Sequence, residues 1–285
     1  MVELIVALKT LFVKEKKSLM LDLTKNYCYD PVLRYQLKLL YKNVDLHKIP
    51  NKDFVYMNLS AILQVFINKI EIGFGTIDLV DRLLSLFKGK TLTSIGPHWA
   101  GIKWACEKNN VKFDDENGDI AYIARPNGRD GLLRKVPFDD FEFVIIDEAY
   151  GDFCDESYIQ YDHTNSIVLK TFSKSLSLPG IRFACSVSSP EIALRLQRLS
   201  HSYSMNGIVQ DIIPAAFHMI KPHVSRMKDT KKFLESKFKH LPSHANFVKM
   251  IEPPPYKVKV SKIEDYYRFT LIGLHELQRL ETKYN

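Results

Sequence analysis

Apolar and polar residues alternate with two different periods through the middle of the chain. Between residues 78 and 88 the apolar side chains recur three and four positions apart, which places them on one face of a helix. Short runs rich in β-branched residues follow, and turn residues separate them, as is typical of strands. We expect helices at 78–88 and 100–109 and strands at 91–95, 119–124, 141–146, 166–171 and 181–187. This alternation predicts an α/β fold, with a mostly parallel, doubly wound sheet covered by helices in a three-layer αβα domain.

The pattern changes after Pro190. Helical periodicity predominates at 191–201, 209–219 and 224–239, and strand-like runs follow at 246–251 and 267–272. We expect this last part to form a small α+β domain together with the N-terminal arm. The predicted division is an N-terminal arm or part of the small domain at 1–50, a large domain at 51–215 and a small C-terminal domain at 216–285.

The composition is that of a globular protein with a substantial core. Of the 285 residues, 46% are hydrophobic and 26% are charged. The net charge of +7 comes from basic residues spread along the chain, which favours a lysine-rich surface over a nucleic-acid-binding face. No run reaches the ~18 uninterrupted apolar residues of a membrane span. The segment Met1 to Val13 lacks the basic leader of a signal peptide, and we interpret it as a short helix or arm.

Cysteines and histidines give little support for a metal site. The four cysteines form no C-x-x-C pair, which favours a reduced, cytoplasmic protein. His240 and His244 are four residues apart, but Pro242 between them prevents a helical pair of ligands. We therefore expect no metal ion.

The strongest chemical signal is a lysine directly after a predicted strand. Lys174 ends the run Thr171-Phe172-Ser173-Lys174, eight residues before Arg182. An amine fixed at a strand end can act as a nucleophile toward an aldehyde. Arg182 could pair with a phosphate through its planar guanidinium, with Ser173 as a second donor. Taken alone, the pattern favours a surface lysine after a strand.

A second signal is an acidic pair at the end of an apolar strand. Residues 144–146 lead into Asp147 and Glu148, and Tyr150 follows. Ligands of open α/β sheets bind beyond the carboxyl ends of the strands, so Asp147 could keep a pyridinium nitrogen protonated there. The alternatives are a helix-capping aspartate and a metal-binding acid. Phosphate-hydrolysing proteins also have a strand followed by Asp-Glu, but the chain lacks a Gly-x-x-x-x-Gly-Lys loop.

The two signals, in this order and 27 residues apart, resemble those of fold-type I pyridoxal-phosphate enzymes. The pattern is most similar to the histidinol-phosphate aminotransferase family of class I/II aminotransferases, with "D-E-A-Y" at 147–150, "T-F-S-K" at 171–174 and "G-x-R" at 180–182. The resemblance extends from about Leu21 to Leu277, in a chain that is divergent and shorter than a usual member. It implies an aspartate-aminotransferase-like fold and a pyridoxal 5'-phosphate cofactor. It also implies a homodimer with a small-molecule amino donor and a 2-oxo acid acceptor.

The resemblance implies a role for each residue of these motifs. Lys174 would form the Schiff base with the cofactor and move the proton at the substrate's α-carbon. Asp147 would pair with the ring nitrogen, and Tyr150 would hydrogen-bond the ring's phenolic oxygen. Ser173 and Arg182 would bind the phosphate.

Three more segments match the cofactor-binding pattern. Gly75, Thr76 and Ile77 match the family's glycine turn around the phosphate, and helix-start amides favour an anion there. The same residues would also serve as a plain helix cap. Trp99 matches the aromatic residue that stacks on the pyridine ring, although it could also be a core residue. Tyr56 resembles the tyrosine that reaches a partner subunit's cofactor phosphate.

Substrate contacts are implied at two positions. Arg268, in a strand similar to the family's "R-I-T-I-G", would grip a carboxylate or phosphate of the substrate, unless it is a solvated strand arginine. The upstream run at 245–248 matches the family's "A-N-F" strand. Tyr29 stands where the family has "N-E-N-P-Y-G" and could replace a substrate-facing tyrosine.

The loop at 125–131 departs from the family. The usual "N-P-N-N-P-T-G" has its second Asn, which contacts the phenolic oxygen, where this chain has Gly128. Asn127 could substitute for that residue only if the loop shifts. Between residues 251 and 266 the usual small-domain arm is also shortened. We therefore expect a divergent member whose substrate need not be histidinol phosphate.

Three functions remain open on the sequence. The first is an aminotransferase that acts on an amino acid or an amino-alcohol phosphate. The second is a pyridoxal-phosphate decarboxylase or lyase related to threonine-phosphate decarboxylase. The third is a non-catalytic or nucleic-acid-associated descendant, against which the intact motif residues argue.

Overall fold

The computed structural model describes residues 21–24, 26–201 and 205–282. Its largest element is a seven-stranded sheet in the order β2-β8-β7-β6-β5-β3-β4. Only β8 runs antiparallel to its neighbours, β2 and β7, and the other pairs of this sheet are parallel. The strands are β2 (Ile70–Gly73), β3 (Thr91–Ser94), β4 (Lys112–Phe113), β5 (Ile120–Ala124), β6 (Phe143–Asp147), β7 (Ser166–Thr171) and β8 (Ala184–Ser188). The predicted α/β fold with a mostly parallel sheet is confirmed.

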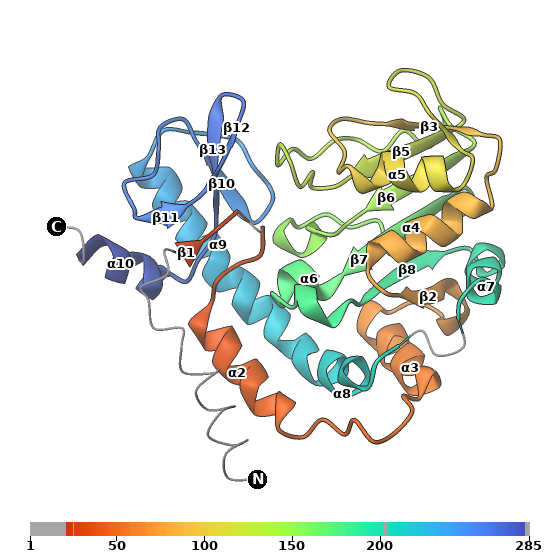
Figure 1. Cartoon of the computed structure of the whole chain (residues 1–285), viewed down its shortest axis with the longest axis horizontal. Helices are drawn as coiled ribbons and strands as arrows, with labels where there is room; N and C mark the ends of the chain where they lie inside the picture. The colour runs from red at the N-terminus through yellow and green to blue at the C-terminus, as the bar shows by residue number, and fades with distance from the viewer. Residues whose placement is uncertain (1–20, 25, 202–204, 283–285) are drawn as a thin grey trace, which may run out of the picture.

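Both faces of this sheet are buried, because successive side chains of each strand enter opposite layers. In β5, Ile120 and Tyr122 pack on one side, and Ala121 and Ile123 pack on the other. The first side is covered by α4 (Thr76–Ser85), α5 (Gly101–Lys108) and α7 (Pro190–Arg198), and the second by α3 (Lys52–Leu63), α6 (Phe172–Ser175) and α8 (Gly207–Ala216). The result is the three-layer arrangement of Figure 1.

A smaller antiparallel sheet lies beside the large one, at the left of Figure 1. Its order is β12-β13-β10-β9, and the helices α9 and α10 are joined to it along the chain. A parallel pair of β1 with β11 brings the N-terminal segment to this region. The elements are β1 (Leu21–Asp22), α2 (Pro31–Tyr41), α9 (Ile220–Lys237), β9 (His240–Leu241), β10 (Phe247–Met250), β11 (Val258–Lys259), β12 (Ser261–Ile263), β13 (Tyr266–Thr270) and α10 (Leu274–Thr282). The large sheet lies within 51–215 and the small one within 216–285, while the domain boundaries themselves stay a prediction.

Two local differences from the sequence pattern bear on the site. The strand expected at 181–187 begins only at Ala184, because Pro179–Ile181 form a 3-10 turn (η3) and Arg182 adopts a left-handed conformation with φ 52°. The helices α2 and α3 were not predicted, although Asp30 and Pro31 form a regular helix start for α2. The predicted N-terminal helix or arm at Met1 to Val13 lies outside the described residues. Within the described ranges, no helix is both long and apolar enough to span a bilayer.

Candidate active site

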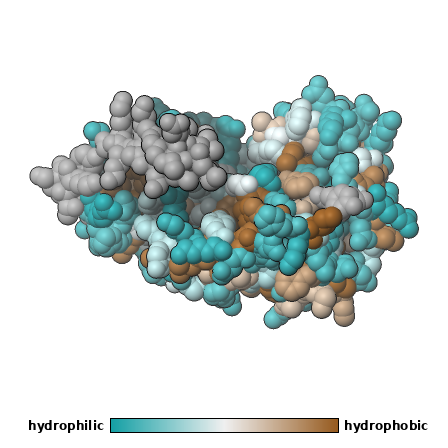
Figure 2. Space-filling model, turned by 60° about the horizontal axis from the view of Figure 1, so that its bottom comes forward, coloured by the Kyte–Doolittle hydropathy of each residue, from teal (hydrophilic) through white to brown (hydrophobic). Residues whose placement is uncertain are grey.

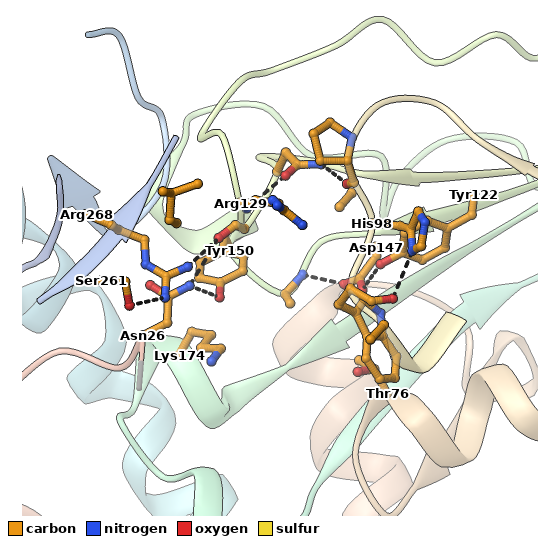
Figure 3. A pocket seen from close by; sticks show the side chains of 18 of the residues that line it. Asn26, Thr76, His98, Tyr122, Arg129, Asp147, Tyr150, Lys174, Ser261 and Arg268 are labelled. Atoms are coloured by element: carbon orange, nitrogen blue, oxygen red, sulfur yellow. Dashed lines mark hydrogen bonds between the residues drawn. The ribbon is translucent and has the colours of Figure 1, made fainter. Parts of the chain in front are cut away.

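A cavity of about 820 Å³ lies at the carboxyl ends of β5 and β6, between the large sheet and the β12–β13 hairpin. In open α/β sheets this edge is where ligands bind. Figure 3 shows side chains from both sheets around the cavity, with Arg268 on the small-sheet side and Asp147 on the large-sheet side. Nine of the predicted site residues line it: Thr76, Ile77, Trp99, Asn127, Asp147, Tyr150, Lys174, Arg182 and Arg268.

Lys174 is presented to the cavity by the short helix α6. Thr171 ends β7 and caps this helix by accepting a hydrogen bond from the Ser173 backbone N–H. The Lys174 Nζ lies 5.5 Å from the centre of the Tyr150 ring. Burial, together with the nearby positive charge of Arg268, lowers the pKa of Lys174 to about 8. A larger share of neutral amine near neutral pH makes this lysine a better nucleophile toward an aldehyde.

Asp147 ends β6 with its carboxylate almost fully buried. Its Oδ2 accepts a hydrogen bond of 2.7 Å from the Tyr122 hydroxyl, and its Oδ1 accepts one of 2.9 Å from the Ala149 backbone N–H. Burial raises the pKa of Asp147, while Tyr122, the Ala149 amide and Lys174 oppose that rise. The geometry gives a carboxylate that is oriented at both oxygens and that faces a cavity, as a partner for a cationic ring nitrogen must be.

Asn26 is a site residue that the motifs missed. Its amide nitrogen donates to the Tyr150 hydroxyl and, over 3.2 Å, to the Gly128 carbonyl. The backbone of Asn26 is left-handed, with φ 56°, a conformation that asparagine tolerates better than most residues. In the sequence, the segment at 26–31 resembles a family motif, and the polar character of Asn26 is the one signal that indicates a site residue there.

The loop at 127–131 uses Asn127 for its own structure. The amide nitrogen of Asn127 donates to the Pro97 carbonyl over 2.6 Å, and its amide oxygen accepts from the backbone N–H groups of Arg129 and Asp130. The side chain therefore lines the cavity but is engaged with the backbone. Gly128 in turn packs directly on Tyr150, since a Cβ atom at 128 would lie 2.4 Å from the Tyr150 Cε2.

Arg182 lies against the start of α4. The backbone of Gly75 has φ 80°, and a Cβ atom on it would lie 2.5 Å from an Arg182 guanidinium nitrogen. Glycine is thus required for Arg182 to lie against the helix start at Thr76 and Ile77. Free amides at a helix start and a guanidinium together suit a phosphate.

Ser173, the other predicted phosphate ligand, lies next to Lys174 but does not line the cavity. Its hydroxyl accepts a hydrogen bond of 3.0 Å from the Thr171 hydroxyl. Its phosphate-binding role stays a prediction.

Arg268 enters the cavity from β13. One of its terminal nitrogens contacts the Thr24 carbonyl at 3.2 Å and the Ser261 hydroxyl at 3.4 Å. Among the described residues, the buried Nε of Arg268 and the buried Oδ1 of Asn26 have no hydrogen-bond partner.

Two more predicted residues, Tyr56 and Tyr29, lie away from this cavity. The Tyr56 hydroxyl is buried and donates to Glu71 Oε2 over 2.5 Å, and Glu71 is in turn paired with Arg82. Tyr29 forms an isolated bridge with Ile272, and the Arg34 guanidinium lies 4.3 Å over its ring. These positions give no support to a contact of Tyr56 with a partner's phosphate or of Tyr29 with a substrate, and both roles stay predictions.

Further lining residues were not singled out from the sequence. Tyr122 lies in an otherwise apolar strand, where a tyrosine is expected to pack in the core. The residues of the β12–β13 hairpin lie in the segment that departs from the family pattern. Within the described part of the chain, no group of histidine, cysteine and acidic side chains could hold a metal ion. The lining residues that the sequence did not indicate include Asn26, His98, Tyr122, Arg129, Ser261, Lys262, Ile263 and Glu264.

Comparisons with known proteins agree with the motifs. The family model "Aminotransferase class I and II" matches residues 142–263. The histidinol-phosphate aminotransferase of Pyrococcus furiosus is 25% identical over 262 residues, which cover 79% of this chain and 76% of that enzyme. Histidinol-phosphate aminotransferase 1 of Nostoc sp. is 31% identical over 156 residues, which cover 48% of this chain and 43% of that enzyme.

Solved structures show the same fold at low sequence identity. The histidinol-phosphate aminotransferase from Sinorhizobium meliloti, in complex with pyridoxal-5'-phosphate, has a TM-score of 0.76 at 16% identity and covers 97% of this chain, with 92% of that chain matched. The L-threonine-O-3-phosphate decarboxylase from Porphyromonas gingivalis has a TM-score of 0.73 at 17% identity, covering 93% of this chain and 98% of that one. The resemblance predicted from the motifs is confirmed: residues 142–263 match the class I and II aminotransferase model, and the chain has the aspartate-aminotransferase-like fold of these solved structures.

Proposed function

We propose that this protein is a pyridoxal-phosphate-dependent aminotransferase that resembles histidinol-phosphate aminotransferase. It would transfer an amino group between an amino acid or amino-alcohol phosphate and a 2-oxo acid. One observation carries the proposal: a lysine of lowered pKa, Lys174, and a buried carboxylate, Asp147, line one cavity with Arg182 and Arg268. The family match supports the cofactor, because class I and II aminotransferases use it.

The residues of the cavity fit this cofactor in three places. Arg182 and the start of α4 would hold the phosphate, and Asp147 would hold the ring nitrogen in its protonated form. Tyr150, with Asn26 on its hydroxyl, would bind the ring's phenolic oxygen. When bound, the cofactor supplies an aldehyde for an amine and a ring that withdraws electrons from the substrate's α-carbon.

Lys174 would move the proton at the α-carbon. Its lowered pKa of about 8 allows the amine to accept a proton near neutral pH and to return it at another atom. Arg268 would fix the substrate by pairing with its carboxylate or phosphate, which orients the α-hydrogen toward the lysine.

The decisive experiment combines a spectrum with product analysis. Purified protein and pyridoxal phosphate should give an absorbance band that free cofactor lacks, and amino donors with a 2-oxo acid should yield a new amine and a new oxo acid. Absence of any new band would contradict every enzymatic function. Binding of the cofactor without turnover of any donor would support a non-catalytic descendant.

A pyridoxal-phosphate decarboxylase is the second candidate, because a threonine-phosphate decarboxylase shares the fold over 93% of this chain. Release of carbon dioxide without a new oxo acid, with an amino acid phosphate as substrate, would favour it over the aminotransferase.

We also propose that the protein is a cytoplasmic homodimer. All four cysteines are free thiols, as a reduced compartment predicts.

A further inference from the structure

Asp147 is held by a side chain outside the motifs that revealed the site. Tyr122, in the middle of β5, donates its hydroxyl proton to Asp147 Oδ2 over 2.7 Å. Tyr122 is fully buried and Asp147 is 5% exposed, so bulk water does not compete for this contact. Figure 3 shows the two side chains meeting at the large-sheet end of the cavity.

The direction of this hydrogen bond follows from its two partners. An ionised carboxylate can only accept, so the Tyr122 hydroxyl donates its proton to Asp147. In a buried site such a bond is electrostatically stronger than it would be in water.

The Tyr122 hydroxyl helps to keep the buried Asp147 carboxylate ionised. Burial raises the pKa of Asp147, and the groups that oppose the rise are Tyr122, the Ala149 amide and the cation of Lys174. Tyr150 also faces this carboxylate, as a neutral phenol whose pKa is raised by burial. Burial and the Asp147 charge raise the pKa of Tyr122 as well, so Tyr122 keeps its proton and remains a donor at any physiological pH.

We propose that Tyr122 is a positioning residue that keeps Asp147 ionised and fixed in orientation for the protonated ring nitrogen of pyridoxal phosphate. This inference rests on the proposed function, since the carboxylate meets the ring only if the cofactor binds here. A neutral carboxyl cannot pair with a pyridinium, so loss of the hydroxyl would weaken cofactor binding through Asp147.

The test is cofactor affinity as a function of pH in Tyr122→Phe, which removes one oxygen and keeps the ring in its packing. Affinity falls on the acid side as Asp147 takes up a proton, and this fall should begin at higher pH in the variant because the carboxylate has lost a donor. At neutral pH the dissociation constant should rise about tenfold or more, as for a lost hydrogen bond to a charged group. Tyr256→Phe, at a buried tyrosine outside the cavity, is the matched control and should change neither quantity.

A cofactor analogue separates this role from a purely structural one. In 1-deazapyridoxal phosphate a carbon replaces the ring nitrogen, so Asp147 has no cation to pair with. The ratio of dissociation constants between Tyr122→Phe and wild type should fall to near one with the analogue. Equal weakening for both ligands would overturn the inference.

A second variant keeps the inference testable if Tyr122→Phe does not fold. 3-Fluorotyrosine at position 122 is a more acidic phenol and a better donor, and it should move the acid limb to lower pH. If the wild-type protein binds pyridoxal phosphate and neither substitution at position 122 changes the affinity or its pH dependence, the proposed role of Tyr122 is overturned and the proposed function is not. A wild-type protein that binds no pyridoxal phosphate overturns the proposed function itself.

Discussion

Gly128 lies against the ring of Tyr150, so closely that a Cβ atom at 128 would be 2.4 Å from Cε2 and 3.1 Å from the hydroxyl oxygen. The relatives' motif places an asparagine at this point of the loop, and here the tyrosine ring fills that space. Asn26, from the N-terminal segment, donates to the same hydroxyl. The Tyr150 hydroxyl thus receives a hydrogen bond from a segment more than a hundred residues away in the sequence.

Restoring the family residue with Gly128→Asn should therefore weaken cofactor binding, because the new side chain displaces the Tyr150 ring. We expect a dissociation constant for pyridoxal phosphate at least about tenfold higher, which corresponds to the low end of an overpacking cost of ~1–3 kcal/mol. Gly180→Ala is the control, since a Cβ atom there meets nothing within 4 Å. Tighter binding in Gly128→Asn would show that the loop moves to accept the asparagine.

Arg268 should set the reactivity of Lys174, because its positive charge helps to lower the pKa of that amine. Acetylation of Lys174 in the cofactor-free protein, followed by mass spectrometry across pH, should have its midpoint near pH 8. Removing the charge with Arg268→Gln favours the protonated amine, so the midpoint should move to higher pH. Burial, the larger cause, is unchanged, and the midpoint should stay below the ordinary lysine value of about 10.4. A midpoint that stays in place or moves down in this variant would contradict the geometry.

A homodimer is expected to form through the face that carries α2 and α3. Figure 2 turns the lower side of Figure 1 forward and shows hydrophobic residues gathered in the middle of that face. Exposed apolar side chains on the two helices are Val32, Tyr35, Leu39, Phe54 and Met57. Exposed apolar side chains favour an interface, and twofold dimers are the commonest oligomers.

Light scattering at micromolar concentration should give twice the chain mass, and Met57→Glu should shift the equilibrium toward the monomer. Leu194→Glu is a suitable control, because Leu194 is 45% exposed on α7, which covers the other side of the sheet. A wild-type protein that is monomeric at this concentration would contradict the predicted homodimer. It would also contradict the predicted contact of Tyr56 with a partner subunit's cofactor phosphate.

The sequence predicted the parts of the site that follow from strand ends. Asp147 ends β6 and Lys174 follows β7, and parallel neighbouring strands bring both residues to one edge of the sheet. Arg268 was predicted only because its strand resembles a family sequence motif. For Asp147 and Lys174, a local pattern and a sheet rule were sufficient.

The remaining contacts depend on distances that no local pattern contains. Asn26 and Tyr150 are 124 residues apart, and Tyr122 and Asp147 are 25 residues apart on adjacent strands. Tyr56 resembles a family tyrosine in the sequence, yet its hydroxyl donates a hydrogen bond to Glu71 of the same chain. A tyrosine in an apolar strand is more often a packing residue, so only the three-dimensional structure identifies Tyr122 as a partner of Asp147.

The central claim is that Lys174 is the residue that binds pyridoxal phosphate covalently. Borohydride reduction of the protein with its cofactor, followed by peptide mapping, measures this directly. Lys170 provides the internal comparison, because it is a buried lysine four residues away whose amine is paired with Asp152 at 2.6 Å. We predict that the reduced cofactor is found on Lys174 and that Lys174→Arg abolishes the label while Lys170→Arg retains it. A label on another lysine, or none in the presence of saturating cofactor, would contradict the account.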